Sequence, residues 1–188
     1  MDNQDRATRL MHLNLLAMNA AQSGDYHSAI DLLTHALQLA PGDGMILHNR
    51  GMAYASLQRW HESLADFNRA IALDPQPTTY EQRGLAHYHI GNRQAARQDW
   101  EQTLHLNPRR TLALGNLGWL SLEDRNFRQA IEYFNRIINI EPTFAKAYEN
   151  RAKAHFEMGS LTEARADLTK ARALIDSGQD TSNKEQYD

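Results

Sequence analysis

The sequence of 188 residues contains no cysteine, so disulfides, cysteine-ligated zinc sites and thiol nucleophiles are excluded together. It also has no apolar run near the ~18 residues that a membrane span needs. The N-terminal apolar stretch is interrupted by His12 and Asn14, which is not the pattern of a secretory signal peptide. We therefore expect a cytoplasmic protein that does not insert into a membrane.

An excess of positive charge is also missing. The 20 Lys and Arg residues and the 23 Asp and Glu residues give a formal net charge of −3. The basic residues are scattered, and the one adjacent pair, Arg109-Arg110, follows Pro108 in a predicted loop. A protein that binds nucleic acid normally has a basic stripe or patch, so nucleic acid is not an expected partner.

Catalytic and metal-binding motifs are absent as well. The sequence has no phosphate-binding loop, no dinucleotide fingerprint and no nucleophile motif. Nine histidines invite a metal interpretation, but His87 and His89 would point about 160° apart on a helix. His48, His105 and His155 lie in different segments, without a helical ligand partner. We expect no enzymatic activity, no bound metal and no cofactor.

Proline is scarce but regularly placed. Four of the five prolines end a similar tripeptide, and they lie 34, 33 and 34 residues apart. Such a period predicts a chain of repeated supersecondary units, and a proline after a helix stops that helix and turns the chain. The tripeptides are Leu39-Ala-Pro41, Leu73-Asp-Pro75, Leu106-Asn-Pro108 and Ile140-Glu-Pro142.

Between the prolines the same helical spacing returns five times. Offsets of four and three residues place each trio of core residues on one face of a second helix. Each first helix carries a small residue that lets the two backbones approach closely, namely Ala17, Gly51, Gly84, Gly118 or Ala152. The second-helix trios are Ala29/Leu33/Ala36, Ser63/Phe67/Ala70, Ala96/Trp100/Thr103, Ala130/Phe134/Ile137 and Ala164/Leu168/Ala171.

These columns resemble the tetratricopeptide repeat family over about residues 10–176. The second unit keeps five residues of the family pattern: Gly51, Tyr54, Phe67, Ala70 and Pro75. The resemblance implies an all-α fold, a right-handed superhelical solenoid of five antiparallel helix pairs whose first helices form the concave wall. The sequence departs from the pattern in having no tryptophan at the start of any unit.

The sequence predicts a complete array with polar ends. Arg165 and Arg172 occupy columns that are mostly apolar in earlier units, and His12 and Asn19 do so at the other end. Residues 1–9 would extend the first helix, and residues 177–188 would form a polar, disordered tail. The five units are expected at residues 10–43, 44–76, 77–110, 111–144 and 145–176.

Three arginine–aspartate pairs recur 16 residues apart, with one partner on each helix of a unit. The other two units have Leu16/Leu32 and Leu117/Tyr133 in the same columns. Because charged and apolar residues are exchanged as pairs, we predict three interhelical salt bridges with a structural role. The pairs are Arg50/Asp66, Arg83/Asp99 and Arg151/Asp167.

The face of each first helix that is left over after core packing is largely apolar and contains several methionines. Methionine suits a surface that accepts varied apolar partners, and a neighbouring column of amides can pair with a peptide backbone. We predict a groove for an amphipathic helix or an extended segment; the alternative is that these side chains are ordinary core. The predicted groove residues are Met11, Met18, Met45, His48, Asn49, Met52, Gln82, Leu85, Tyr88, Asn116, Trp119, Lys146, Asn150 and Lys153.

The expected partner is another protein or a peptide, bound by an adaptor or chaperone. The family also includes a carboxylate clamp for the C-terminal acid of heat-shock chaperones, which needs Asn and Lys one turn apart. The first unit has Asn14 and Met18 there, so this mode is not expected. Two alternatives stay open: a structural protein that assembles into a homo-oligomer, and an accessory subunit of a larger complex.

Overall fold

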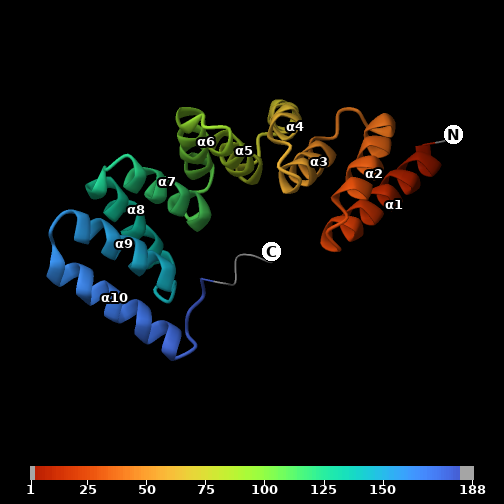
Figure 1. The fold of residues 1–188 in the computed structure, drawn as a ribbon. Helices are drawn as coiled ribbons and strands as arrows, with labels where there is room; N and C mark the ends of the chain where they lie inside the picture. The colour runs from red at the N-terminus through yellow and green to blue at the C-terminus, as the bar shows by residue number, and fades with distance from the viewer. Residues whose placement is uncertain (1–2, 183–188) are drawn as a thin grey trace. The chain divides into compact units, whose positions relative to one another are not determined.

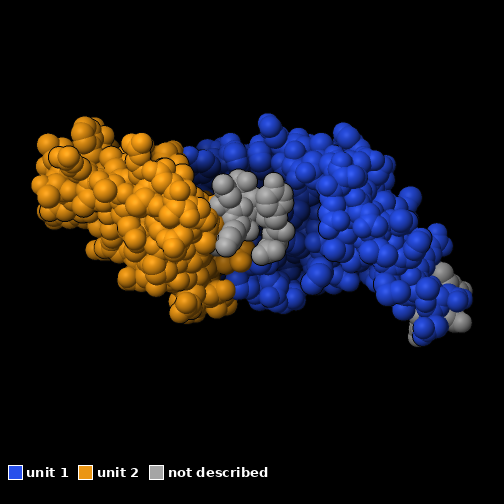
Figure 2. Space-filling view, turned by 90° about the horizontal axis from the view of Figure 1, so that it is seen from below, with its two compact units in different colours: residues 1–102 blue, residues 103–188 orange. Residues whose placement is uncertain are grey.

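Ten helices follow one another along the computed structural model, which describes residues 3–182 (Figure 1). The chain divides into two compact units, Met1–Gln102 and Thr103–Asp188 (Figure 2). The division falls within helix α6, Arg93–Leu106. No β-strand occurs in the described range. The helices are α1 (Asn3–Gln22), α2 (Tyr26–Leu39), α3 (Gly44–Ser56), α4 (Trp60–Leu73), α5 (Pro77–His89), α6 (Arg93–Leu106), α7 (Thr111–Glu123), α8 (Phe127–Ile140), α9 (Ala145–Glu157) and α10 (Leu161–Asp176).

The helices pack as sequential antiparallel pairs, so the prediction of an all-α stack of five pairs is confirmed. Within the first unit α1 packs on α2 and α3 on α4, and within the second unit α7 packs on α8 and α9 on α10. The second helix of a pair also packs on the first helix of the next pair, as α2 does on α3, α4 on α5 and α8 on α9.

Three pairs are held by an aromatic ring that lies against a glycine of the partner helix. A Cβ atom on any of these glycines would lie 2.6–2.7 Å from a ring atom, so only glycine allows this helix separation. The rings are at most 2% exposed. The pairs are Gly51 with Phe67, Gly84 with Trp100, and Gly118 with Phe134.

The turns inside the five pairs share one backbone conformation, with a left-handed residue at the equivalent position. Gly24, Gly91 and Gly159 have φ angles of 81°, 81° and 78°. In the other two turns the position is taken by Gln58 and Arg125, with φ angles of 57° and 58°. A side chain in this region costs roughly 1–2 kcal/mol, so two of the five turns are strained.

The polar residues that the sequence indicated are exposed at both ends of the array, but Leu168 on α10, predicted as a core residue, is 54% exposed as well. Arg165 and Arg172 are exposed on α10, and His12 and Asn19 are exposed on α1. Arg6, in the segment before residue 10, donates from Nε to the carbonyl oxygen of Leu39 at 2.9 Å. This hydrogen bond ties the start of α1 to the end of α2.

Residues 177–182 of the predicted tail return to the start of α9. The Ala145 N–H donates to Asp180 Oδ1 at 3.0 Å, and the Lys146 N–H donates to Ser182 Oγ at 3.0 Å. Burial alone would raise the pKa of Asp180, but hydrogen bonds from Ser182 and Ala145 together hold it below its ordinary value. The described part of the tail therefore caps a helix, which its polar composition did not indicate. Residues 183–188 lie outside the described residues.

Candidate functional site

The first helices of the first unit expose a row of methionines. Met11 is 70% exposed and Met18 48% exposed on α1, and Met45 is 68% exposed on α3. Met52, about two turns further along α3, is half-buried. The two methionines of each helix are seven residues apart, so Met11 and Met18 lie on one side of α1. Met45 and Met52 lie on one side of α3 in the same way.

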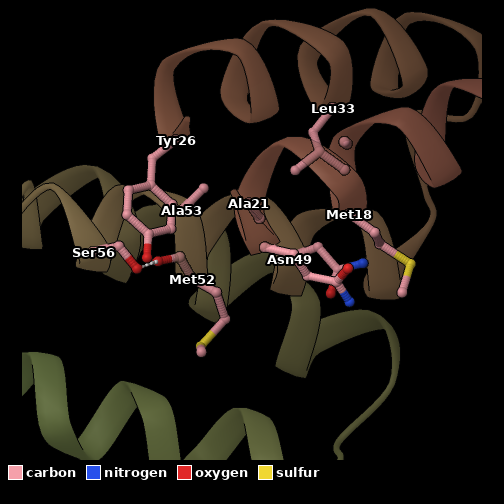
Figure 3. Close-up of a pocket in the computed structure, with 10 residues that line it drawn as sticks. Met18, Ala21, Tyr26, Leu33, Asn49, Met52, Ala53 and Ser56 are labelled. Carbon is pink, nitrogen blue, oxygen red and sulfur yellow. Dashed lines mark hydrogen bonds between the residues drawn. The ribbon is translucent and has the colours of Figure 1, made fainter. Parts of the chain in front are cut away.

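A hollow of about 230 Å³ lies between α1 and α3 (Figure 3). Met18 from α1 and Asn49 and Met52 from α3 line it, and Tyr26 at the start of α2 also contributes. Its lining is mostly apolar, with the Asn49 amide as a group that can both donate and accept hydrogen bonds. Such a hollow can hold an apolar side chain of a peptide, and the Asn49 amide can hydrogen-bond to the peptide backbone.

Two further hollows follow along α1, α3 and α5. Met11, Asn14 and Met45 line one of them. Met45, His48 and Asn49 line the other, which extends to Thr79. His48 Nδ1 lies 3.0 Å from Thr79 Oγ1, and burial lowers the pKa of His48 below its ordinary value. Since Met45 and Asn49 are each shared between neighbouring hollows, the predicted groove residues of α1 and α3 form one lining surface.

The second unit has its own hollow, of about 240 Å³, between α7 and α9. Lys153 holds its Nζ atom 4.7 Å from the centroid of the Trp119 ring, and Trp119 Nε1 donates to Glu123 Oε1 at 3.0 Å. The indole is thereby fixed beside the hollow while its ring remains 39% exposed. Four predicted groove residues line this hollow: Asn116, Trp119, Lys146 and Asn150.

The predicted groove residues of α5 are placed differently. Gln82, Leu85 and Tyr88 are half-buried and line none of these four hollows. The Tyr88 ring lies 6.1 Å from Trp100, which belongs to the core. Tyr26 was missed by the sequence argument, although large residues occupy the same column in other units, as Trp60 and Phe127 do.

We call the first-helix wall the surface formed by the predicted residues that line these hollows. It has two parts, described separately because they belong to different units. The first-unit part comprises Met11, Met18, Met45, His48, Asn49 and Met52; the second-unit part comprises Asn116, Trp119, Lys146 and Asn150.

The structure brings each of the three arginine–aspartate pairs together as a two-point ion pair. Arg50 donates to Asp66 at 2.7 and 2.8 Å, and the carboxylate side chain is only 4% exposed. The hydrogen bond to Asp66 raises the pKa of Arg50 above its ordinary value. The other two pairs have N–O distances of 2.6–2.9 Å: Arg83 with Asp99, and Arg151 with Asp167.

Each of these arginines also bonds to the second helix of the preceding pair. The Arg50 Nη1 group donates to Thr34 Oγ1 at 3.0 Å, so one guanidinium joins α2, α3 and α4. The spacing of the arginines and aspartates did not predict this third contact. The equivalent bonds run from Arg83 to Asn68 at 2.8 Å and from Arg151 to Asn135 at 2.5 Å.

Among residues 3–182, no three His, Cys, Asp or Glu side chains gather closely enough to hold a metal ion. In the same part of the chain, no helix combines the length and the apolar character that a membrane crossing requires.

Family models described as tetratricopeptide repeat match the chain along most of its length. They cover residues 13–43, residues 44–77, and residues 82–143 and 122–178 with one model. The last model alone covers more than half of the chain.

Curated relatives are much longer than this chain. Tetratricopeptide repeat protein 6 of Homo sapiens is 25% identical over 134 residues, which are 71% of this chain and 26% of that protein. The BBSome complex member BBS4 of Bos taurus is 25% identical over 160 residues, 85% of this chain and 30% of that protein. The chain therefore spans less than a third of the length of these relatives.

Solved structures with the same fold cover nearly the whole chain. The crystal structure of MamA protein has a TM-score of 0.81 at 22% identity and covers 90% of this chain and 93% of its own. YrrB, described as a TPR protein with an unusual peptide-binding site, has a TM-score of 0.72 at 16% identity, covering 86% and 84%. At these identities the likeness shows the fold alone.

Proposed function

Since the chain belongs to the tetratricopeptide repeat family, we propose that it is an adaptor or chaperone that binds a peptide or an amphipathic helix on its first-helix wall. As a protein of this family it is a protein–protein interaction module. The identity of the surface and the chemistry of its partner are the substance of the proposal. They rest on the side chains of the wall.

The observation that carries the proposal is the exposed methionine row beside the hollow between α1 and α3. Met18 is 48% exposed although Ala17, next to it, is 2% exposed and belongs to the core. A partner side chain in this hollow would contact Met18 and Met52 and remove their apolar surface from water. The flexible thioethers adapt to side chains of different shapes, so the wall favours apolar partners over one fixed sequence.

Polar groups of the wall favour a polypeptide over a purely apolar ligand. Asn49 stands between two hollows of the first unit, and Asn116 and Asn150 stand together in the hollow of the second unit. A primary amide donates and accepts hydrogen bonds at once, as a peptide backbone does. The apolar hollows would then take side chains while the amides hold the backbone.

The proposal is tested with peptides selected on the full chain from a random display library. Their affinities are measured for the wild type, for the Met18→Ser/Met52→Ser variant, and for Met158→Ser as the matched control. Met158 is 42% exposed but lies in the turn after α9, outside the wall. Removing both wall methionines should weaken binding about tenfold or more, since each loses about 1 kcal/mol of apolar burial.

Circular dichroism of the same variants separates a binding effect from an unfolding effect. Equal affinities for all three proteins would reject the wall as the binding surface. Loss of helicity in the double variant would instead assign these methionines to the core, and binding by Trp119→Ser then tests the second-unit part of the wall independently.

A further inference from the structure

The last helix exposes an apolar stripe that the first-helix wall does not include. Leu161, Leu168 and Ile175 are 62%, 54% and 50% exposed on α10. They are seven residues apart, so they form a single line along the helix. We call these three residues the α10 stripe. Three large aliphatic side chains in line on one helix form a continuous exposed apolar surface, which marks an interaction site more often than scattered residues do.

On α2 the columns of Leu161 and Leu168 are covered by α1 together with α3, the first helix of the next pair. The column of Ile175 falls just after α2, at Ala40, which packs against the same cluster as Leu33. Leu33, in the column of Leu168, is 2% exposed and clusters with Ile46 and Leu47 of α3. Tyr26, in the column of Leu161, packs against the cluster that Ala53 of α3 forms with Ala29 and Ile30. The α10 stripe therefore continues the contact surface that joins successive pairs, but no helix covers it within residues 3–182.

The residues beside the α10 stripe are charged, whereas the equivalent residues of α2 are apolar. Arg165 and Arg172 occupy the columns of Ile30 and Leu37, which are buried against α3. Arg172 has only a long, exposed contact with Asp176, with 3.6 Å between Nε and Oδ2. A helix that covers the stripe must therefore place acidic groups opposite these two arginines to avoid an unpaired charge in the contact.

We propose that α10 binds an acidic amphipathic helix of another protein, which lies on the α10 stripe as the first helix of a further repeat would. Apolar residues of that helix cover Leu161, Leu168 and Ile175. Carboxylates of that helix pair with Arg165 and Arg172. The surface is separate from the first-helix wall, and it does not depend on what the wall binds.

Neither end helix of a second copy, α1 or α10, supplies such a helix. The outward α1 helix contains one acid, Asp5, against Arg6, Arg9 and His12. Two α10 helices that cross antiparallel at Leu168 would bring Arg165 of each copy against Arg172 of the other. Like charges at such positions oppose the contact, so the charge pattern favours a foreign acidic helix over self-association.

The chain itself provides the template for a probe. In α3, Ile46 lies against Leu37 and Ala53 lies against Ile30, and the same columns of α9 contain Ala147 and Ala154. The acidic probe is a peptide with the sequence of α9, held helical by a staple on its far face, with Ala147→Glu and Ala154→Glu. The basic control peptide carries Ala147→Lys and Ala154→Lys.

Both peptides are titrated against the full chain, its Arg165→Glu/Arg172→Glu variant, and a control with the same charge change, Arg128→Glu/Lys170→Glu. Arg128 is exposed on α8, and Lys170 is exposed on α10, about 160° around the helix from Leu168. We expect the wild type and the control variant to bind the acidic peptide about tenfold or more tightly than the basic one. The Arg165→Glu/Arg172→Glu variant should reverse this preference.

Equal binding of the two peptides, or no binding of the acidic one, would overturn the proposal. So would binding that is lost in Met18→Ser/Met52→Ser but kept in the Arg165→Glu/Arg172→Glu variant, because the peptide would then occupy the wall. Sedimentation of the full chain gives the last discriminating outcome. A dimer that dissociates on Leu168→Ser would show that a second copy covers the α10 stripe instead.

Discussion

The ion pair between Arg50 and Asp66 offers the sharpest prediction about stability. Replacing Arg50 with Leu leaves the Asp66 carboxylate, 4% exposed, without the two N–H groups that it accepts from. An uncompensated buried charge of this kind costs about 3–5 kcal/mol. We therefore expect Arg50→Leu to lower the free energy of unfolding by that amount, and Asp66→Leu to be destabilising as well.

The double variant Arg50→Leu/Asp66→Leu should behave differently from both single variants. It recreates the Leu16/Leu32 arrangement that the first pair already uses. Replacing both partners of a buried ion pair with apolar residues is often neutral or stabilising. We expect the double variant to recover most of the stability, to within about 1 kcal/mol of the wild type.

The assay is urea unfolding followed by circular dichroism at constant pH and salt, with Arg59→Ala as the matched control. Arg59 pairs with Glu62 at 2.8 Å, but both side chains are 45% exposed, so its loss should cost about 0–1 kcal/mol. If Arg50→Leu costs no more than Arg59→Ala, the carboxylate of Asp66 does not depend on Arg50 as a buried charge would. A double variant as unstable as Arg50→Leu would equally contradict this interpretation of the pair.

Substitutions also test the strained turns, the buried His48 and the cap that Asp180 provides. Gln58→Gly and Arg125→Gly should each stabilise the protein by roughly 0.5–1 kcal/mol in urea unfolding; a loss of stability would contradict the strained turns. Because burial lowers the pKa of His48, the unfolded state binds protons more readily. The free energy of unfolding should therefore fall as the pH drops below about 6.5. His48→Asn should make it depend less on pH in this range, and an unchanged pH dependence would contradict the role of His48. Asp180→Ala should lower the free energy of unfolding by about 0.5–2 kcal/mol and speed amide exchange at Ala145. Unchanged exchange would show that Asp180 does not accept the Ala145 N–H.

The repeat organisation could be predicted from the sequence because the same spacing of prolines and apolar residues recurs in successive units. The prolines and the apolar columns predicted helix pairs that the structure has, and the exchange of Arg/Asp for Leu/Leu placed the partners Arg50 and Asp66 in contact. A pairwise exchange reports contact within one pair of helices. It does not report the register between successive pairs, so the bond from Arg50 to Thr34 was not predicted.

The features that the sequence did not reveal depend on single residues without a periodic signal. Gln58 adopts a left-handed backbone conformation that glycine usually occupies, so its residue type did not predict it. Asp180 caps α9 from a segment whose polarity indicated disorder. Spacing grouped Tyr88 with the groove, but its ring is half-buried and lies 6.1 Å from that of the core residue Trp100.

Methyl-methionine NMR of the full chain, titrated with a library-selected peptide, shows directly whether the first-helix wall is the binding surface. The signals of Met11, Met18, Met45 and Met52 should shift together, while that of Met158 does not. Saturable binding that leaves the four wall signals unchanged would contradict this prediction.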